Sequence, residues 1–181
     1  DLVSGRFFSK NVSYSTIPDF GQLSRFNSSG GGNVEVLSNV GSWPSSAGIT
    51  AGCVVRYTAT TVGNDDCMVD FRNSANTWRL KLTTHSSTGQ GFRVFAKNGG
   101  SRSINYSGGS DPNDNEIHRI IASIGNSSRL RFAVDDFGVQ DTSASGGSPQ
   151  TPDDFKLGSD GGGGSGQGAI YCAYAFSRQL S

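Results

Sequence analysis

The chain has 181 residues, with 15 basic and 15 acidic side chains, so its formal net charge at neutral pH is zero. Its length is typical of a single domain, and a 34% hydrophobic content with 10% aromatic residues can build a core without metal or disulfide support. No stretch concentrates Lys or Arg, which excludes the basic surface that nucleic acid requires, and no apolar run approaches the roughly 20 residues that span a bilayer.

The first twenty residues differ from the rest because they are rich in Ser and contain the pair Phe7 and Phe8. We predict that residues 1–20 form an N-terminal arm or edge segment and that residues 21–181 form a single β-sandwich domain. An arm of this kind can pack its aromatic pair on a neighbouring subunit, so Phe7 and Phe8 are candidate assembly contacts.

Apolar residues alternate with polar ones in many short segments that Gly, Asn, Asp and Ser separate, while helical spacing is nearly absent. The apolar faces of nine predicted strands are Val34 and Val36; Cys53, Val55 and Tyr57; Cys67, Val69 and Phe71; Trp78, Leu80 and Leu82; Phe92, Val94 and Ala96; Ile120, Ala122 and Ile124; Leu130, Phe132 and Val134; Phe155 and Leu157; and Ile170, Cys172, Tyr174 and Phe176. This pattern predicts an all-β fold of two packed antiparallel sheets. Most of the 26 glycines fall in the connectors, where turn geometry explains them better than phosphate binding.

Cys53, Cys67 and Cys172 are odd in number and lack the spacing of a zinc site or a disulfide framework. We predict that they are buried thiols, because free Cys behaves as a small core hydrophobe.

Several segments near the C-terminus share a family pattern. Residues 118–124 resemble a strand written as Trp-His followed by a hydrophobic stretch, and residues 130–136 resemble a strand that ends in an Asp-Gly turn, with Asp136 in place of the Gly. Residues 155–158 resemble a short strand that ends in Gly, and the closing segment 168–181 ends in a similar Arg-x-Leu-Ser. Together these segments resemble the laminin-G-like domains of the concanavalin A-like lectin/glucanase superfamily, of the kind found in phage and bacterial surface proteins. The resemblance implies a jelly-roll sandwich of two curved antiparallel sheets.

The superfamily also contains glycoside hydrolases, which usually need two paired carboxylates. The only glutamates, Glu35 and Glu116, lie in different segments, and adjacent Asp pairs fall in predicted turns, where neighbouring side chains diverge. His85 and His118 lack a nucleophile motif. We therefore expect no catalytic residues and no enzyme.

Relatives in this family often bind calcium at loop carboxylates, which makes calcium the one cofactor that the resemblance implies. Asp135, Asp136, Asp154 and Asp160 lie in connectors that the resemblance would place at the rims of the sandwich. They are candidate ligand-binding residues, and the alternative is that they are solvated turn residues. Their spacing is not a metal motif, so no metal site is assigned.

Trp43, in a loop that ends in Pro44, is the candidate stacking platform for a sugar. The alternative is that Trp43 anchors its loop on the edge of the sandwich.

Two classes of function remain, a binding module and a structural subunit of an assembly. We expect a non-catalytic binding or assembly module, in the first place a structural surface protein of a virion or similar assembly, such as a decoration, fibre or adhesion domain. The first alternative is a free-standing, lectin-like glycan-binding module, and the second is a degenerate or unrecognised glycan-active enzyme. The expected partners are protein subunits of an assembly, including copies of the chain in a homo-oligomer, or a cell-surface glycan, and the expected location is a virion surface or the extracellular space.

Overall fold

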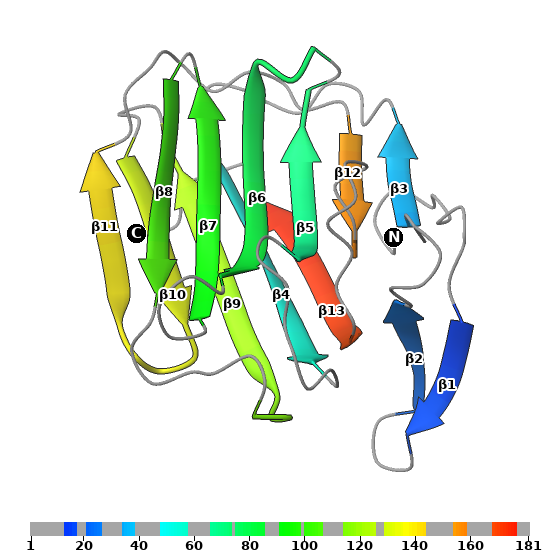
Figure 1. The fold of residues 1–181 in the computed structure, drawn as a ribbon. Helices are drawn as coiled ribbons and strands as arrows, with labels where there is room; N and C mark the ends of the chain where they lie inside the picture. The colour runs from blue at the N-terminus through cyan, green and yellow to red at the C-terminus, as the bar shows by residue number, and fades with distance from the viewer. Residues whose placement is uncertain are drawn as a thin grey trace.

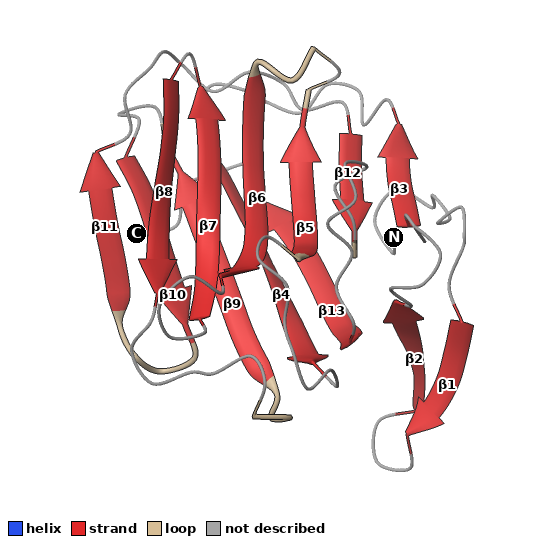
Figure 2. Cartoon of the chain, in the orientation of Figure 1, coloured by secondary structure: helices blue, strands red, loops and turns tan. Residues whose placement is uncertain are grey.

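A computed structural model of the chain describes residues 13–17, 21–26, 34–38, 48–57, 66–73, 75–85, 91–98, 100–106, 114–125, 129–143, 154–158 and 168–176. Within these ranges the chain forms thirteen strands and no helix (Figure 2). The strands are β1 (Ser13–Ile17), β2 (Gly21–Phe26), β3 (Val34–Ser38), β4 (Ile49–Tyr57), β5 (Cys67–Arg72), β6 (Trp78–His85), β7 (Gly91–Asn98), β8 (Gly100–Tyr106), β9 (His118–Ile124), β10 (Arg129–Val134), β11 (Val139–Ser143), β12 (Asp154–Leu157) and β13 (Gly168–Phe176). In the described residues no helix is long and apolar enough to cross a membrane.

The strands form two sheets in which every described pairing is antiparallel. One sheet has seven strands in the order β1-β2-β13-β4-β9-β10-β11, and the other has six in the order β3-β12-β5-β6-β7-β8. Figure 1 shows most of the six-stranded sheet in front of the seven-stranded one. Strands β4 and β5, β6 and β9, β7 and β10, and β8 and β11 contact each other across the interior. The predicted all-β, two-sheet antiparallel sandwich is confirmed.

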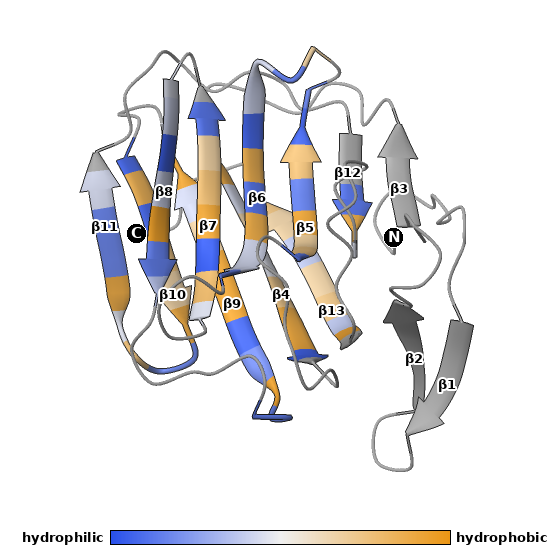
Figure 3. Cartoon of the chain, viewed as in Figure 1, coloured by the Kyte–Doolittle hydropathy of each residue, from blue (hydrophilic) through white to orange (hydrophobic). Residues whose placement is uncertain are grey.

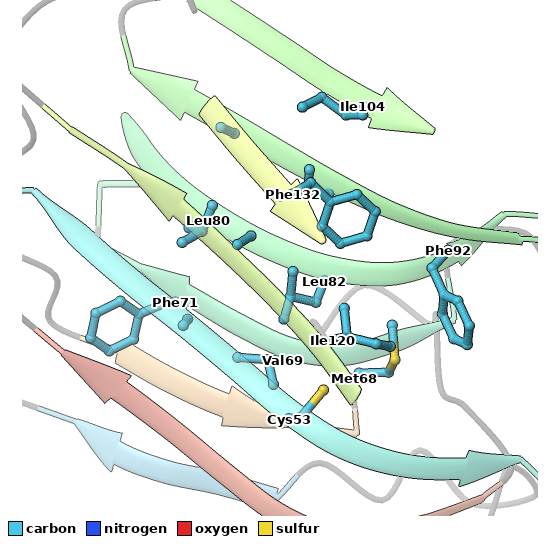
Figure 4. Packing of buried hydrophobic residues seen from close by; sticks show 14 of the residues in the cluster. Cys53, Met68, Val69, Phe71, Leu80, Leu82, Phe92, Ile104, Ile120 and Phe132 are labelled. Atoms are coloured by element: carbon cyan, nitrogen blue, oxygen red, sulfur yellow. The ribbon is translucent and has the colours of Figure 1, made fainter. Parts of the chain in front are cut away.

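Hydrophobic and hydrophilic residues alternate along many of the strands (Figure 3). The core lies between the sheets because these strands turn their apolar face inward. Leu80 and Leu82 of the six-stranded sheet are fully buried, and Ile120 and Phe132 of the other sheet lie in the same cluster (Figure 4). Trp78 of β6 is fully buried as well. Burial of each such large side chain contributes about 1.5–3 kcal/mol. The predicted core residues of β6, β7, β9 and β10 are confirmed.

A β-bulge changes the predicted face of β5. Its register with β6 shifts between Cys67 and Val69, so Cys67 lies opposite Thr83 while Val69 lies opposite Leu82. Met68 joins the core cluster, and Cys67, although buried, does not. The prediction that Cys67 shares a face with Val69 is wrong because the bulge breaks the alternation.

A second bulge has a larger consequence, in β13. The register with β4 shifts between Ile170 and Cys172, and from that point Ala173 and Ala175 pack against the core. Residues two apart on a strand share a face, so Tyr174 lies on the outer face with Cys172. The predicted single apolar face from Ile170 to Phe176 is therefore wrong, and the aromatic end of this strand points away from the core.

At one end of the seven-stranded sheet, β1 pairs with β2, which in turn pairs with β13. Residues 13–17 are therefore the edge strand of this sheet. The boundary at residue 20 stays a prediction, and Phe7 and Phe8 lie outside the described residues.

Candidate functional site

Five adjacent strands, β13, β4, β9, β10 and β11, align their outward side chains in rows across the seven-stranded sheet. The register places one row as Tyr174, Gly52, Ile121, Ala133 and Val139, and the next as Phe176, Thr50, Ser123, Arg131 and Asp141. We call the first the apolar row and the second the polar row. At about 4.8 Å between strands, each row is about 19 Å long.

A pocket of about 470 Å³ lies over these rows, and we call it the outer-face pocket. Thr50 and Ser123 line it but are buried, so they form its base. Its more exposed lining includes Arg131, Asp141 and Val139, the last of which is 67% exposed. The volume lies within the roughly 300–1,000 Å³ of small-molecule sites, and apolar side chains lie beside charged ones, as such sites require.

An aromatic pair adjoins the pocket at the β13 end of the rows. The ring centroids of Tyr174 and Phe176 are 5.7 Å apart at an interplanar angle of 48°, and Phe176 is 43% exposed. A Cβ on Gly52 would lie 2.5 Å from the Tyr174 hydroxyl and 2.7 Å from the carbonyl oxygen of Ile120. The absence of a side chain at Gly52 therefore lets the Tyr174 ring lie against the backbone of β4. Burial is the main cause that raises the pKa of Tyr174, followed by Cys53 and Cys172, so its hydroxyl stays protonated at neutral pH.

Charged side chains lie at the β11 end. Arg129 Nε donates to Asp141 Oδ1 at 2.8 Å, and Arg131 Nε lies 3.7 Å from Asp141 Oδ2. The Arg129 side chain is 56% exposed, whereas those of Arg131 and Asp141, which line the pocket, are 30% and 27% exposed. Two guanidinium groups therefore flank one carboxylate at this end.

Asp135, a predicted ligand-binding residue, has a structural role in the turn after β10. Its backbone has φ of 49°, its amide donates to Arg119 O at 2.7 Å, and its Oδ1 accepts from Arg119 N at 2.7 Å. Its Oδ2 lies 2.9 Å from His118 Nδ1, while Nε2 of the same ring lies 3.0 Å from Asp114 Oδ1. His118 is buried with its ring against Phe92. Both carboxylate oxygens of Asp135 are thus engaged in holding β9 to the turn.

The other predicted site residues are spread over the chain. Asp136 is exposed in the same turn as Asp135, and Asp154 begins β12 in the six-stranded sheet, so the sheets separate them. Trp43 and Asp160 lie outside the described residues. In the described part of the chain no group of three or more His, Cys, Asp or Glu could hold a metal ion. The calcium site and the Trp43 platform stay predictions.

The three cysteines are free thiols, and they differ in burial. Cys53 and Cys67 are buried as predicted, but Cys172 is exposed because it follows the bulge in β13. Burial, and next the proximity of Cys172, raises the pKa of the Cys53 thiol far above its ordinary value.

The residues that build the outer-face pocket were not among those singled out from the sequence. Arg131 and Asp141 are outward residues of ordinary alternating strands, and nothing in their spacing marks them. A signal did exist for Tyr174 and Phe176, because Ala173 and Ala175 offer an equally regular alternative inward face.

No family model matches the sequence, and no curated protein matches it. Solved structures do match in fold. Domains LG4-5 of the mouse laminin alpha1 chain superpose with a TM-score of 0.69 at 11% identity, over 100% of this chain and 48% of that chain. The chain has a laminin-G-like fold. A structure of botulinum neurotoxin type C superposes on this laminin-G-like sandwich with a TM-score of 0.70 at 14% identity, over 99% of this chain and 45% of that one.

A third match has a length close to that of this laminin-G-like sandwich. The CBM40 of Ruminococcus gnavus IT-sialidase, bound to alpha2,3 sialyllactose, has a TM-score of 0.58 at 10% identity over 82% of this chain and 91% of that chain. The chain spans about half the length of the laminin and toxin structures. The predicted resemblance to laminin-G-like domains is thereby confirmed at the level of the fold.

Proposed function

We propose that this laminin-G-like sandwich is a non-catalytic carbohydrate-binding module that holds part of a glycan in its outer-face pocket. The observation that carries the proposal is the bulge in β13, which turns Tyr174 and Phe176 outward beside a pocket of about 470 Å³. A sugar ring has an apolar C–H face and a rim of hydroxyl groups. Tyr174, Phe176 and Val139 could contact the apolar face. Arg131 and Asp141 could form hydrogen bonds with the hydroxyl groups.

The proteins that share the fold support a carbohydrate ligand. The Ruminococcus gnavus CBM40 was solved with alpha2,3 sialyllactose, and botulinum neurotoxin type C depends on interaction with two ganglioside molecules to enter cells. The CBM40 carries more weight, because this chain covers 91% of it and only 45% of the toxin structure.

The charges of the pocket support binding without catalysis. Among the described residues that line it, Asp141 is the one carboxylate, and glycoside hydrolysis usually takes two. Glu116 precedes β9, and Glu35 belongs to β3 of the other sheet. A glycan-active enzyme is therefore the weaker alternative.

Glycan-array screening followed by calorimetry tests the proposal. We expect Phe176→Ser and Tyr174→Ala each to weaken glycan binding at least about fivefold, because each removes a stacking surface. Phe95→Ser is the matched control, since Phe95 is a partly buried aromatic on β7 in the other sheet. An array without a bound glycan, or equal losses for Phe95→Ser and Phe176→Ser with all variants folded, would reject the proposal.

Cell-surface glycans face the outside of the cell, so a module that binds them would act in the extracellular space. The finer role predicted from the sequence, a structural surface protein of a virion or similar assembly, stays a prediction beside this function. A binding module can be part of such an assembly.

A further inference from the structure

The charges that line the outer-face pocket cancel. Among the described residues of the lining, Arg131 is the one cation and Asp141 is the one carboxylate, and Arg131 Nε lies 3.7 Å from Asp141 Oδ2. A ligand with a negative charge would meet a cation that already has a counter-charge and a carboxylate that repels it. The lining therefore favours a ligand without a charge.

The carboxylate of Asp141 can still accept hydrogen bonds from such a ligand. Its two oxygens offer about four acceptor positions. Arg129 Nε lies 2.8 Å from Oδ1 and 2.6 Å from Oδ2, while Arg131 Nε, at 3.7 Å, is beyond hydrogen-bond distance. Arg129 lies outside the described lining, so it holds the carboxylate from beside the pocket. Asp141 is thus fixed in orientation and keeps acceptor positions for O–H donors.

The apolar row beside Asp141 leaves room for one sugar ring. Ile121, Ala133 and Val139 belong to the adjacent strands β9, β10 and β11, and all three line the pocket. The outer two lie about 9–10 Å apart across the sheet, and Ala133 between them has only a methyl group. Asp141 is the next outward residue of β11 after Val139, so hydroxyl groups of a ring over Ala133 would point toward its carboxylate.

We propose that the outer-face pocket selects an uncharged sugar over the corresponding uronic acid, and that Asp141 determines this preference by accepting hydrogen bonds from two adjacent hydroxyl groups. The inference rests on the proposed carbohydrate-binding function and names its ligand class. Hydrogen bonds to an ionised acceptor are about twice as strong as those between neutral groups. A carboxylate in place of the sugar's hydroxymethyl group would instead be repelled by Asp141.

Two matched pairs of probes test this preference. Methyl β-D-glucopyranoside is compared with methyl β-D-glucuronide, and methyl β-D-galactopyranoside with methyl β-D-galacturonide, so that a carboxylate replaces the hydroxymethyl group and nothing else changes. NMR titration of the backbone amides gives each Kd and shows that every variant is folded. We expect the neutral member of at least one pair to bind about tenfold more tightly than its acid, the effect of one charged hydrogen bond.

Asp141→Asn should act on the two classes of probe in opposite directions. It should weaken the neutral glycoside about tenfold, because an N–H donor replaces one acceptor oxygen and the charge is lost. It should strengthen the acid, because Arg129 and Arg131 then lack their counter-charge. A monodeoxy glycoside that lacks one of the two hydroxyl groups should lose about tenfold in the parent protein and little in Asp141→Asn. Asp136→Asn, which removes the same charge from an exposed turn, is the matched control and should leave all probes unchanged.

Ala133→Leu tests the location separately, since its larger side chain would fill the floor of the pocket and should abolish the binding of every probe. Acids that bind as tightly as the neutral glycosides in both pairs, or a neutral preference that survives Asp141→Asn, overturn the inference and leave the proposed function in place. If none of the four probes binds, the inference is also overturned, and the glycan array decides the proposed function by itself. Glycan binding that Ala133→Leu leaves unchanged would contradict the proposed function as well.

Discussion

Gly52 is the residue on which the aromatic end of the pocket depends. A Cβ there would meet both the hydroxyl of Tyr174 and the backbone carbonyl of Ile120. The tyrosine could move aside, but the carbonyl belongs to β9 and is fixed by the sheet. One hydrogen atom in place of a methyl group thus lets the phenol end of the Tyr174 ring lie against the sheet.

We therefore predict that Gly52→Ala destabilises the protein by about 1–3 kcal/mol, a usual cost of overpacking, and also weakens glycan binding by displacing Tyr174. Denaturant unfolding and calorimetry measure the two effects. Gly138→Ala is the control. Gly138 has φ of 86°, and a methyl group there would have no atom within 4 Å, so the variant should lose stability through backbone strain and keep its binding. Unchanged glycan binding in Gly52→Ala would contradict the role assigned to Tyr174.

Cys53 and Tyr174 make stability sensitive to alkaline pH. Burial is the main cause that raises the pKa of Cys53 above its ordinary value of 9.0 and that of Tyr174 above 10.0. Both groups hold their protons more tightly in the folded state, so the unfolded state releases protons first as pH rises and the free energy of unfolding falls. The stability that these two groups contribute is fully present below about pH 9. As the pH rises further, the contribution of Cys53 is lost first and that of Tyr174 next.

Urea unfolding between about pH 7 and pH 11 checks this order. Above pH 9 we expect Cys53 alone to lower the free energy of unfolding by about 1.4 kcal/mol per pH unit, and Cys53→Ala to remove that slope. Tyr174→Phe should reduce the slope only above about pH 10. The slopes are compared, not the absolute stabilities, because Cys53→Ala also leaves a small cavity. Equal slopes in Cys53→Ala and the parent protein would contradict the assignment.

At the scale of elements, the turn from β10 to β11 is held by Asp135. We predict that Asp135→Ala destabilises the protein by about 2–4 kcal/mol. The variant loses the carboxylate contacts to His118 and Arg119. Alanine at φ of 49° would also keep the backbone strain without a polar side chain to offset it. Asp136→Ala, at the exposed neighbouring position, should change stability by less than about 0.5 kcal/mol. Thermal unfolding compares them, and Asp135→Asn should keep part of the stability. Equal effects at both positions would show that the contacts of Asp135 are not needed.

Alternation in the sequence predicted every strand with a strong apolar face, and it missed β1, β2, β8 and β11. Three of these are edge strands, and β2 is next to one. An edge strand faces a neighbour on one side only and contributes few core residues, as in the exposed positions of Gly100–Tyr106, so its pattern is weak. The candidate site was missed for another reason. A bulge adds one residue without any marker in the composition, and that residue decides whether Tyr174 faces the core or the solvent.

At the scale of the whole molecule, the register of five strands builds the pocket. Thr50 and Phe176 are more than a hundred positions apart in the sequence, and they become neighbours only when β4 and β13 pair in the sheet. Arg131 and Asp141 become neighbours in the same way when β10 pairs with β11. Such a pocket has no local motif, which is why composition and spacing indicated the sandwich and not the outer-face pocket.

The predicted homo-oligomer can use either of two surfaces. The arm hypothesis assigns assembly to Phe7 and Phe8. Among the described strands, β11 is an edge strand, and Val139 on it is 67% exposed. An edge strand with exposed apolar side chains can pair with the same strand of a second copy of the chain. Light scattering on the whole chain should give a mass above that of the 19.0 kDa monomer. If the arm is responsible, the double variant Phe7→Ser, Phe8→Ser should lower the mass to that of the monomer, and Val139→Lys should leave it unchanged. If the β11 edge is responsible, Val139→Lys should lower the mass and the double variant should leave it unchanged. A monomer at the highest concentration measured would contradict the oligomer itself.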